Sequence, residues 1–337
     1  MAQLLGLILL SFVISIILIV PFIDFLYRIK LQRQKQVTRD IFDKRTPTFD
    51  KYNAWKVGTP FGGGIIIILI VSILTFWAYG IFNIDTKPWE AFVLFFGFIG
   101  FGLLGLYDDM KKMVNGNGKH IFWGLRFRHK FLIQWILAII IAVVFYTQLN
   151  GNFLFIHGIG SLHLGAFFIP FAAFIIVSFV NAFNITDGLD GLASGSFLVC
   201  LIAFLAISQQ QLDQSLGIFI AVLIGAIIAF LYFNIYKARI WLGDVGSLSL
   251  GAALAVIGLL TGKTLALMII GGIFVLEVAS SLIQLLSKKY LKRKVFPAAP
   301  LHLWLLRRGW EEPKIVMRAW IIGIFFAILG LYLAFIG

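Results

Sequence analysis

Two amides, two carboxylates and a threonine hydroxyl lie close together in segment 181–192, between two runs with almost no polar residues. If the preceding helix continues into this segment, Asn181, Asn184 and Asp187 recur every three residues and share one face. Two glycines then loosen the backbone, which lets Asp190 turn toward the same place. Polar groups at this density between apolar segments are costly unless they bind something. The segment is therefore the first candidate for a functional site.

The motif Asp108-Asp109-x-x-Lys112 supplies a second group of charged residues. Neighbouring residues of a helix point about 100° apart, so we expect the two carboxylates to have different tasks rather than to chelate one ion together. Both have helical spacing to Lys112, and for this motif alone a surface ion pair is the simpler interpretation. Asp244, between two glycines at the start of another apolar run, is suited to ligate a cation or to cap a helix.

Further polar candidates are scattered along the chain. Lys56 precedes a stretch rich in glycine, residues 58–64, where backbone N–H groups could approach an anion, although taken alone the stretch is more simply a loop-to-helix junction. His302 is the only histidine that the topology places near the carboxylates. Glu277 shares a helix face with Gln284 and needs a buried partner, so we expect a structural role for it. The remaining candidates for substrate binding are Lys130, Asn234, Trp241 and Gln284.

The composition determines which elements must position these residues. Hydrophobic residues make up 61% of the 337 and charged residues 13%, with a mean hydropathy of +0.98, so the chain is an integral membrane protein. Its apolar runs are too long for the strands of an outer-membrane barrel, which predicts an all-α protein. The single cysteine, Cys200, excludes a disulfide framework.

The distribution of basic residues predicts the topology of ten transmembrane helices. Of the 28 Lys and Arg residues, 26 fall in loops on one side of the membrane, the exceptions being Lys87 and Lys263. The positive-inside rule makes that side cytoplasmic, so both termini are extracytoplasmic and the polar clusters lie on the cytoplasmic face. Membrane lipid therefore accounts for the net charge of +13, and no nucleic-acid partner is expected. The predicted spans are 3–26, 62–82, 91–107, 131–149, 166–184, 192–209, 216–236, 246–262, 264–287 and 319–336.

Together, these clusters predict a chemistry that none of them predicts alone. Carboxylates and lysines without a cysteine or histidine cluster suit a hard ion with oxygen ligands, Mg²⁺ or Mn²⁺, and not zinc. Mg²⁺ is usually held by one or two carboxylates plus substrate phosphates. The sequence thus predicts phosphoryl transfer at the bilayer surface. The residues that share the cytoplasmic face are Asp108, Asp109, Asp187, Asp190 and Asp244, with Lys56, Lys112 and Lys130.

Three motifs in this order resemble the polyprenyl-phosphate N-acetylhexosamine-1-phosphate transferases, which exchange the UMP of a nucleotide sugar for a lipid phosphate. They are Asp108-Asp109-x-x-Lys112, Asn181-x-x-Asn184-x-Thr-Asp187-Gly-Leu-Asp190-Gly-Leu and Gly243-Asp244-x-Gly-Ser. The second is specific, whereas the first is weak alone. The glycine-rich stretch after Lys56 and the segment 309–322 look most like the branch that transfers phospho-MurNAc-pentapeptide. The resemblance covers the whole chain, residues 1–337, as one polytopic transferase domain.

Two departures from that branch concern regions near its nucleotide-sugar site. The branch normally carries three consecutive histidines where this chain has His302-Leu303-Trp304. Its Gly-Thr-Pro-Thr-Met-Gly-Gly is here Gly-Thr-Pro-Phe61-Gly-Gly-Gly. The departures make the identity of the sugar substrate less secure than the class of reaction.

The resemblance implies a reaction in the bacterial cytoplasmic membrane between UDP-MurNAc-pentapeptide and undecaprenyl phosphate, giving lipid I, and it implies a homodimer. Mg²⁺ on Asp244 would bridge the diphosphate, which Lys112 and Lys130 also bind. Asn184, Asp187 and Asp190 would hold the nucleoside end and the water shell of the metal ion. Asp108 or Asp109 would orient or deprotonate the lipid phosphate. A lipid phosphate is largely ionised near pH 7, which favours direct attack over a covalent aspartyl-phosphate, though both stay open.

Three alternatives remain. A sister transferase that takes UDP-GlcNAc or a related sugar is favoured by the missing histidines and disfavoured by the tail that contains Trp310. An ion-coupled transporter would place its carboxylates near the membrane midplane, often in repeated halves, whereas here they lie at span ends and no internal repeat is visible. An inactive binding scaffold is the third alternative, and the retained set of aspartates argues against it.

Overall fold

The computed structural model describes residues 1–32, 50, 54–114, 125, 127–156 and 160–336. In these residues the chain is almost entirely helical, as predicted. The helices are α1 (Ala2–Arg28), η1 (Ala54–Lys56), α3 (Gly63–Ile81), α4 (Pro88–Val114), α5 (Phe127–Gln148), η2 (Gly165–Phe167), α6 (Phe168–Thr186), α7 (Leu192–Gln210), α8 (Gln214–Asn234), α9 (Gly243–Leu260), α10 (Thr264–Ile270), α11 (Gly272–Tyr290), α12 (Leu301–Arg307) and α13 (Glu312–Ile336).

Within the described residues, nine helices are long and apolar enough to cross a membrane. Each corresponds to a predicted span, and most boundaries agree to within a few residues. The exceptions affect the polar clusters, because α4 continues seven residues beyond its predicted end and α13 begins seven residues before its predicted start. Asp108, Asp109 and Lys112 therefore lie on a continuous helix, and so does Glu312.

The ninth predicted span, 264–287, is wrong as a single helix. The chain forms α10 and α11 there, and their axes differ in direction by 79°. Two consecutive glycines, Gly271 and Gly272, lie at the break, and glycine pairs are a common cause of sharp helix kinks. They also make room for aromatic rings, since a Cβ atom would lie 2.6 Å from Phe179 at the first glycine and 2.5 Å from Phe326 at the second.

A small β-hairpin interrupts the all-α architecture. Strands β1 (Phe153–Ile156) and β2 (Gly160–His163) pair antiparallel, with Phe153 opposite His163. His163 ends the second strand, whereas His157 lies outside the described residues.

Helices α8 and α9 form the centre of the bundle. Helix α8 is apolar on all sides and is buried along almost its whole length, as expected for a helix without a polar face. Helix α9 packs against α3, α4 and α6. The outer helices α1, α5 and α13 instead expose rows of large apolar side chains, such as Leu9, Ile136 and Ile321, which suits contact with lipid.

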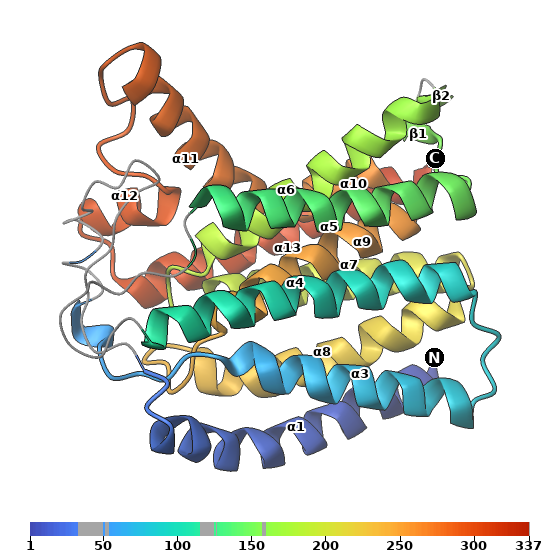
Figure 1. Cartoon of the computed structure of the whole chain (residues 1–337), viewed down its shortest axis with the longest axis horizontal. Helices are drawn as coiled ribbons and strands as arrows, with labels where there is room; N and C mark the ends of the chain where they lie inside the picture. Colours follow the sequence, from blue (N-terminus) through green and yellow to red (C-terminus); the bar gives the residue numbers. More distant parts are fainter. Residues whose placement is uncertain (33–49, 51–53, 115–124, 126, 157–159, 337) are drawn as a thin grey trace.

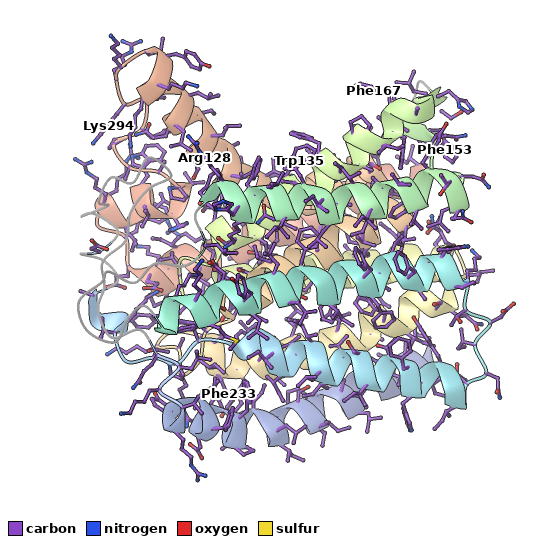
Figure 2. The ribbon with its side chains drawn as sticks, viewed as in Figure 1. Arg128, Trp135, Phe153, Phe167, Phe233 and Lys294 are labelled. Carbon is purple, nitrogen blue, oxygen red and sulfur yellow. The ribbon has the colours of Figure 1, made fainter. Side chains whose placement is uncertain are left out.

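The two ends of the bundle differ in composition. Both chain termini lie at the same end as the hairpin, whereas α12 and the last turns of α11 lie at the opposite end (Figure 1). Arg128 and Lys294 lie at the end that carries α12, and the aromatic residues Phe153 and Phe167 lie at the hairpin end (Figure 2). This arrangement agrees with an even number of membrane crossings and with the predicted concentration of basic residues on one side.

Candidate active site

The position of Asp244 depends on close contacts between three helices. At Gly105 of α4, a Cβ atom would lie only 2.1 Å from the carbonyl oxygen of Asp244, so glycine permits the backbone of α9 to approach α4. At Gly64 of α3, a Cβ atom would lie 2.2 Å from Gly246 of α9. Gly243 begins α9 with a φ of +73°, a conformation that favours glycine. The first turn of α9 is therefore held between α3 and α4.

Six predicted site residues from four helices meet at this turn, and we call them the Asp244 cluster. Asp244 Oδ2 lies 2.7 Å from Lys112 Nζ and is also paired with Lys130. Its other oxygen, Oδ1, accepts a hydrogen bond of 3.1 Å from Asn184 Nδ2. The cluster has three carboxylates and two ammonium groups, so its described side chains carry excess negative charge. Its members are Asp108, Asp109, Lys112, Lys130, Asn184 and Asp244.

The two adjacent carboxylates of α4 make different contacts. Asp109 Oδ2 accepts a hydrogen bond of 3.1 Å from the backbone N–H of Val245, which attaches α4 to the first turn of α9. Asp108 instead accepts from the backbone N–H of Leu125, and its Oδ2 lies 3.1 Å from Lys130 Nζ. Lys112 lies within 3.3 Å of both carboxylates. These geometries match the expectation that the two aspartates have separate tasks.

A second buried group, the Lys56 cluster, consists of Lys56, Asp190, Trp241 and Glu312. Lys56 Nζ lies 2.9 Å from Asp190 Oδ1 and 2.6 Å from Glu312 Oε1, and all three side chains are buried. Trp241 donates its indole N–H to Asp190 Oδ1 at 3.2 Å, and Lys56 lies over its ring. Glu312 also accepts the backbone N–H of Asp190 at 2.7 Å. The loop after α6, the 3₁₀ helix η1 and the start of α13 are thereby joined.

Asp187 caps the C-terminal end of α6 and lies within electrostatic range of both clusters. Burial raises the pKa of its carboxyl group well above the usual range, and the charge of Lys56 opposes this rise. Among the described residues, none donates a hydrogen bond to this half-buried carboxylate. A cation bound beside it would favour the ionised form.

The other predicted residues contact the protein itself. Asn181 donates to Gln134 of α5, and Asn234 accepts from Ser194 and donates to the carbonyl oxygen of Ile240. Gln284 forms two hydrogen bonds with the backbone of Phe296, at 2.8 and 2.9 Å, so it lies against the segment that leads to α12 rather than in either cluster. His302 is paired with Glu277, which supplies the buried partner that the sequence required.

Sequence reasoning missed three residues that bond predicted site residues: Glu312, Gln134 and Ser247. Glu312 lies in the segment 309–322 that the resemblance singles out, but its spacing gave no sign of an ion pair 256 residues away. Ser247 accepts from Asn184 at 2.7 Å, and its position one turn after Asp244 on α9 was a usable signal. Gln134, a buried amide within α5, was a second signal because such a group needs a partner.

The donor set suits a metal ion that is held by few protein ligands. In the described part of the chain, no three histidine, cysteine, aspartate or glutamate side chains converge on a shared position for a metal ion. Mg²⁺, however, commonly takes one or two carboxylates and completes its shell with water and substrate phosphates. Asp244 and Asp187, whose carboxylate accepts no hydrogen bond from the described residues, could provide such ligands, and the Asp244 cluster contains more carboxylates than ammonium groups, which would favour a cation.

Comparison with known proteins gives a consistent result over nearly the full length. Residues 91–262 match glycosyl transferase family 4. A phospho-N-acetylmuramoyl-pentapeptide-transferase from Geobacillus thermodenitrificans is 36% identical over 324 residues, which cover 96% of this chain and 95% of the relative. The protein of the same name from Rickettsia canadensis is 39% identical, covering 82% of this chain and 80% of the relative. That from Bacillus pumilus is 35% identical, covering 97% and 96%.

Proposed function

The chain belongs to glycosyl transferase family 4 and, within it, to the phospho-N-acetylmuramoyl-pentapeptide-transferases. From this premise we propose that it transfers phospho-MurNAc-pentapeptide from UDP-MurNAc-pentapeptide to undecaprenyl phosphate. The products are lipid I and UMP. The observation that carries the proposal is the Asp244 cluster, in which Lys112 and Lys130 converge on one carboxylate at the ends of membrane helices. Lysines that converge in this way can bind a diphosphate, and that group is common to the donor and the leaving nucleotide.

The lysines and the metal ligands share the task of binding charge. Lys112 and Lys130 bind the phosphates of the donor, and Asp244 with Asp187 would hold Mg²⁺, for which Mn²⁺ is a chemical substitute. When bound, the ion neutralises the charge on the phosphates and on the leaving UMP. Asn184 fixes the orientation of Asp244 through the 3.1 Å hydrogen bond to Oδ1.

Asp108 orients the lipid phosphate for attack. Its carboxylate lies beside Lys130 and Lys112, so a phosphate that binds these lysines is placed next to it. An oxygen of the lipid phosphate forms a bond to the β-phosphorus of the donor, the bond from that phosphorus to the bridging oxygen breaks, and UMP leaves with the electron pair. The attacking oxygen is already ionised near pH 7, so Asp108 needs only to position it. Asp109 holds the first turn of α9 through Val245.

The Lys56 cluster is suited to the nucleoside end of the donor. Two of its members lie close in the sequence to proposed metal ligands, since Trp241 precedes Asp244 and Asp190 follows Asp187 by three residues each. Trp241 offers an aromatic face, and the buried Asp190 orients it by accepting its indole N–H, while the other carboxylate oxygen accepts the backbone N–H of Ala238. Asn234 holds the backbone of the segment that carries Trp241 through the carbonyl oxygen of Ile240. Aromatic stacking and carboxylate acceptors are common means of recognising a nucleobase and ribose.

We further propose that the end with α12 faces the cytoplasm of a bacterium and that both termini face the opposite side. The support is the partition of basic residues and the position of Lys112 and Lys130 at the end of α4 and the start of α5, which lie on the side of α12 (Figure 1). A nucleotide sugar is a water-soluble cytoplasmic metabolite, so its site has to open on that face. A homodimer is a further expectation from the resemblance.

The proposal is tested by release of UMP in detergent, with undecaprenyl phosphate and Mg²⁺ present. UDP-MurNAc-pentapeptide and UDP-GlcNAc are supplied in separate reactions, and Asp244→Ala serves as the blank. Release with the pentapeptide donor alone supports the proposal. Release with UDP-GlcNAc alone keeps the reaction class and replaces the substrate by that of a sister transferase. No release above the blank with either donor contradicts the proposed activity.

A further inference from the structure

Glu277 and His302 form a buried pair that has no role in the steps described for the proposed reaction. Glu277 lies on α11 and His302 in the first turn of α12, and their side chains are only 6% and 1% exposed. One carboxylate oxygen, Oε2, lies 3.0 Å from the ring atom Nδ1 of His302. The other, Oε1, accepts the backbone N–H of the same histidine at 3.1 Å. The glutamate therefore fixes both the backbone and the ring of His302.

This geometry determines which ring atom remains for a ligand. An ionised carboxylate only accepts hydrogen bonds, so Nδ1 carries the hydrogen that it donates to Glu277. The other ring nitrogen, Nε2, is buried and has no hydrogen-bond partner among the described residues. A buried polar atom without a partner is uncommon and points to a ligand or to a catalytic role.

Nε2 is directed at the loop between the two clusters. If Gly188 carried a Cβ atom, that atom would lie 2.5 Å from Nε2, so only the absence of a side chain at this position lets the nitrogen lie against the loop. Gly188 follows Asp187, to which we assign the metal ion, and precedes Asp190 of the Lys56 cluster. A donor that spans both clusters would pass this position.

The neighbouring residues of α12 do not present polar atoms to the same place. Leu303 is buried in contact with protein, and Trp304 packs against Phe296 and stacks with the guanidinium group of Arg308. His302 is thus the member of His302-Leu303-Trp304 that faces the loop at Gly188. The two positions at which this chain departs from the triple histidine point elsewhere.

We propose that Glu277 is a positioning residue for the transfer reaction, which holds the imidazole of His302 so that Nε2 hydrogen-bonds the nucleotide-sugar donor beside Gly188. This inference rests on the proposed function. In an alternative interpretation, the pair only attaches α12 to α11, and its loss lowers stability without changing the affinity of the folded protein for the donor.

Steady-state kinetics of Glu277→Gln separate these interpretations. The glutamine has nearly the same size but loses the charged acceptor for Nδ1, and loss of a charge-assisted hydrogen bond corresponds to a change of roughly 10-fold or more. We expect the KM for UDP-MurNAc-pentapeptide to rise by about 10-fold, with little change in the KM for undecaprenyl phosphate. Ser280→Ala is the matched control, because Ser280 lies one turn along α11 and bonds only the backbone oxygen of Glu277.

A double-mutant cycle with His302→Gln gives a second readout. If Glu277 acts through His302, Glu277→Gln adds little to the rise in donor KM that His302→Gln causes alone. Additive effects, an equal rise in both KM values, or an unchanged donor KM with a lowered melting temperature would each overturn the proposal. If the wild-type protein releases no UMP, the proposed function fails. The positioning role is then tested by equilibrium binding of UDP to the wild type and to Glu277→Gln. Equal affinities of the two proteins for UDP would overturn the positioning role.

Discussion

Gly105→Ala tests whether the close approach of α4 to α9 sets the geometry of the Asp244 cluster. The added Cβ atom would lie 2.1 Å from the carbonyl oxygen of Asp244, 2.4 Å from its carbonyl carbon and 2.5 Å from the nitrogen of Val245. All three are backbone atoms, so no side-chain rotation can relieve the overlap. Ordinary van der Waals contact begins at 3.4 Å, and the two helices must therefore separate by roughly 1.3 Å at this point.

A displacement of this size affects every contact of the cluster. Asp109 would lose its hydrogen bond to Val245, and the carboxylate of Asp244 would move away from Lys112. Misplacement of a reacting group by about 1 Å can cost on the order of 100-fold in rate. We expect kcat for UMP release to fall by about that factor, with a smaller effect on the amount of folded protein, because overpacking typically costs about 1–3 kcal/mol.

Gly100→Ala is the matched control for this prediction. It makes the same change on the same helix, but the nearest atom to the new Cβ is the end of the Leu137 side chain at 3.8 Å. Both variants are compared by UMP release per folded molecule, with folding checked by size-exclusion chromatography and thermal unfolding in detergent. If Gly105→Ala retains the kcat of Gly100→Ala, the cluster tolerates the displacement and our account of its geometry is wrong.

Three further predictions concern individual charges. Lys112→Ala should lower kcat/KM for UMP release by on the order of 100-fold. Lys111→Ala, which alters the exposed neighbouring residue, should have little effect. Equal losses in the two variants would refute the assignment of phosphate binding to Lys112. Glu312→Ala should destabilise the protein by about 3 kcal/mol, because it removes one of the described carboxylates that pair with the buried Lys56. The control is Glu311→Ala, which alters an exposed side chain. A thermal or denaturant unfolding curve equal to that of the control would contradict the prediction. Asp187→Asn should raise the Mg²⁺ concentration for half-maximal UMP release by roughly 10-fold. Asp85→Asn, near the hairpin end, should leave that concentration unchanged. An unchanged Mg²⁺ titration for Asp187→Asn argues against a metal-binding role for Asp187.

The membrane architecture was predictable because its two main causes are visible in a linear sequence. A helix must be apolar for about 20 residues to satisfy a bilayer, and basic residues concentrate in the loops of one side. Both signals depend on local composition alone. Nine of the ten predicted spans in the described part of the chain accordingly match helices of the structure.

The break between α10 and α11 was not predicted because hydropathy gives the length of an apolar run but not the direction of the helix axis. The run through Ile270 and Phe274 stays apolar, so it has the composition of a single span. The bend depends on how Phe179 and Phe326, from two other helices, fill the space left by Gly271 and Gly272. Such contacts join residues far apart in the sequence, and a single sequence does not specify them.

The candidate site was predicted in part for the same reason. The aspartates stood out because a carboxylate beside an apolar run requires an explanation, and spacing placed Asn184 near the same face as Asp187. Spacing could not pair Lys56 with Glu312 or place Lys130 against Asp244. It placed Gln284 on the same helix face as Glu277 but did not reveal that both ends of its amide bond Phe296, in the segment supporting α12.

The contacts of Asp244 connect binding of the donor with binding of the metal ion. In the structure, Lys112 and Lys130 both pair with Oδ2 of Asp244, the residue that we propose as a ligand of Mg²⁺. An ammonium group that turns to bind a phosphate weakens its pairing with this oxygen, and the carboxylate then carries more uncompensated negative charge. Because the cluster already has more carboxylates than lysines, this redistribution favours a cation. Donor and Mg²⁺ are therefore expected to strengthen each other's binding, and the lysines act as counterions of Asp244 until the donor arrives.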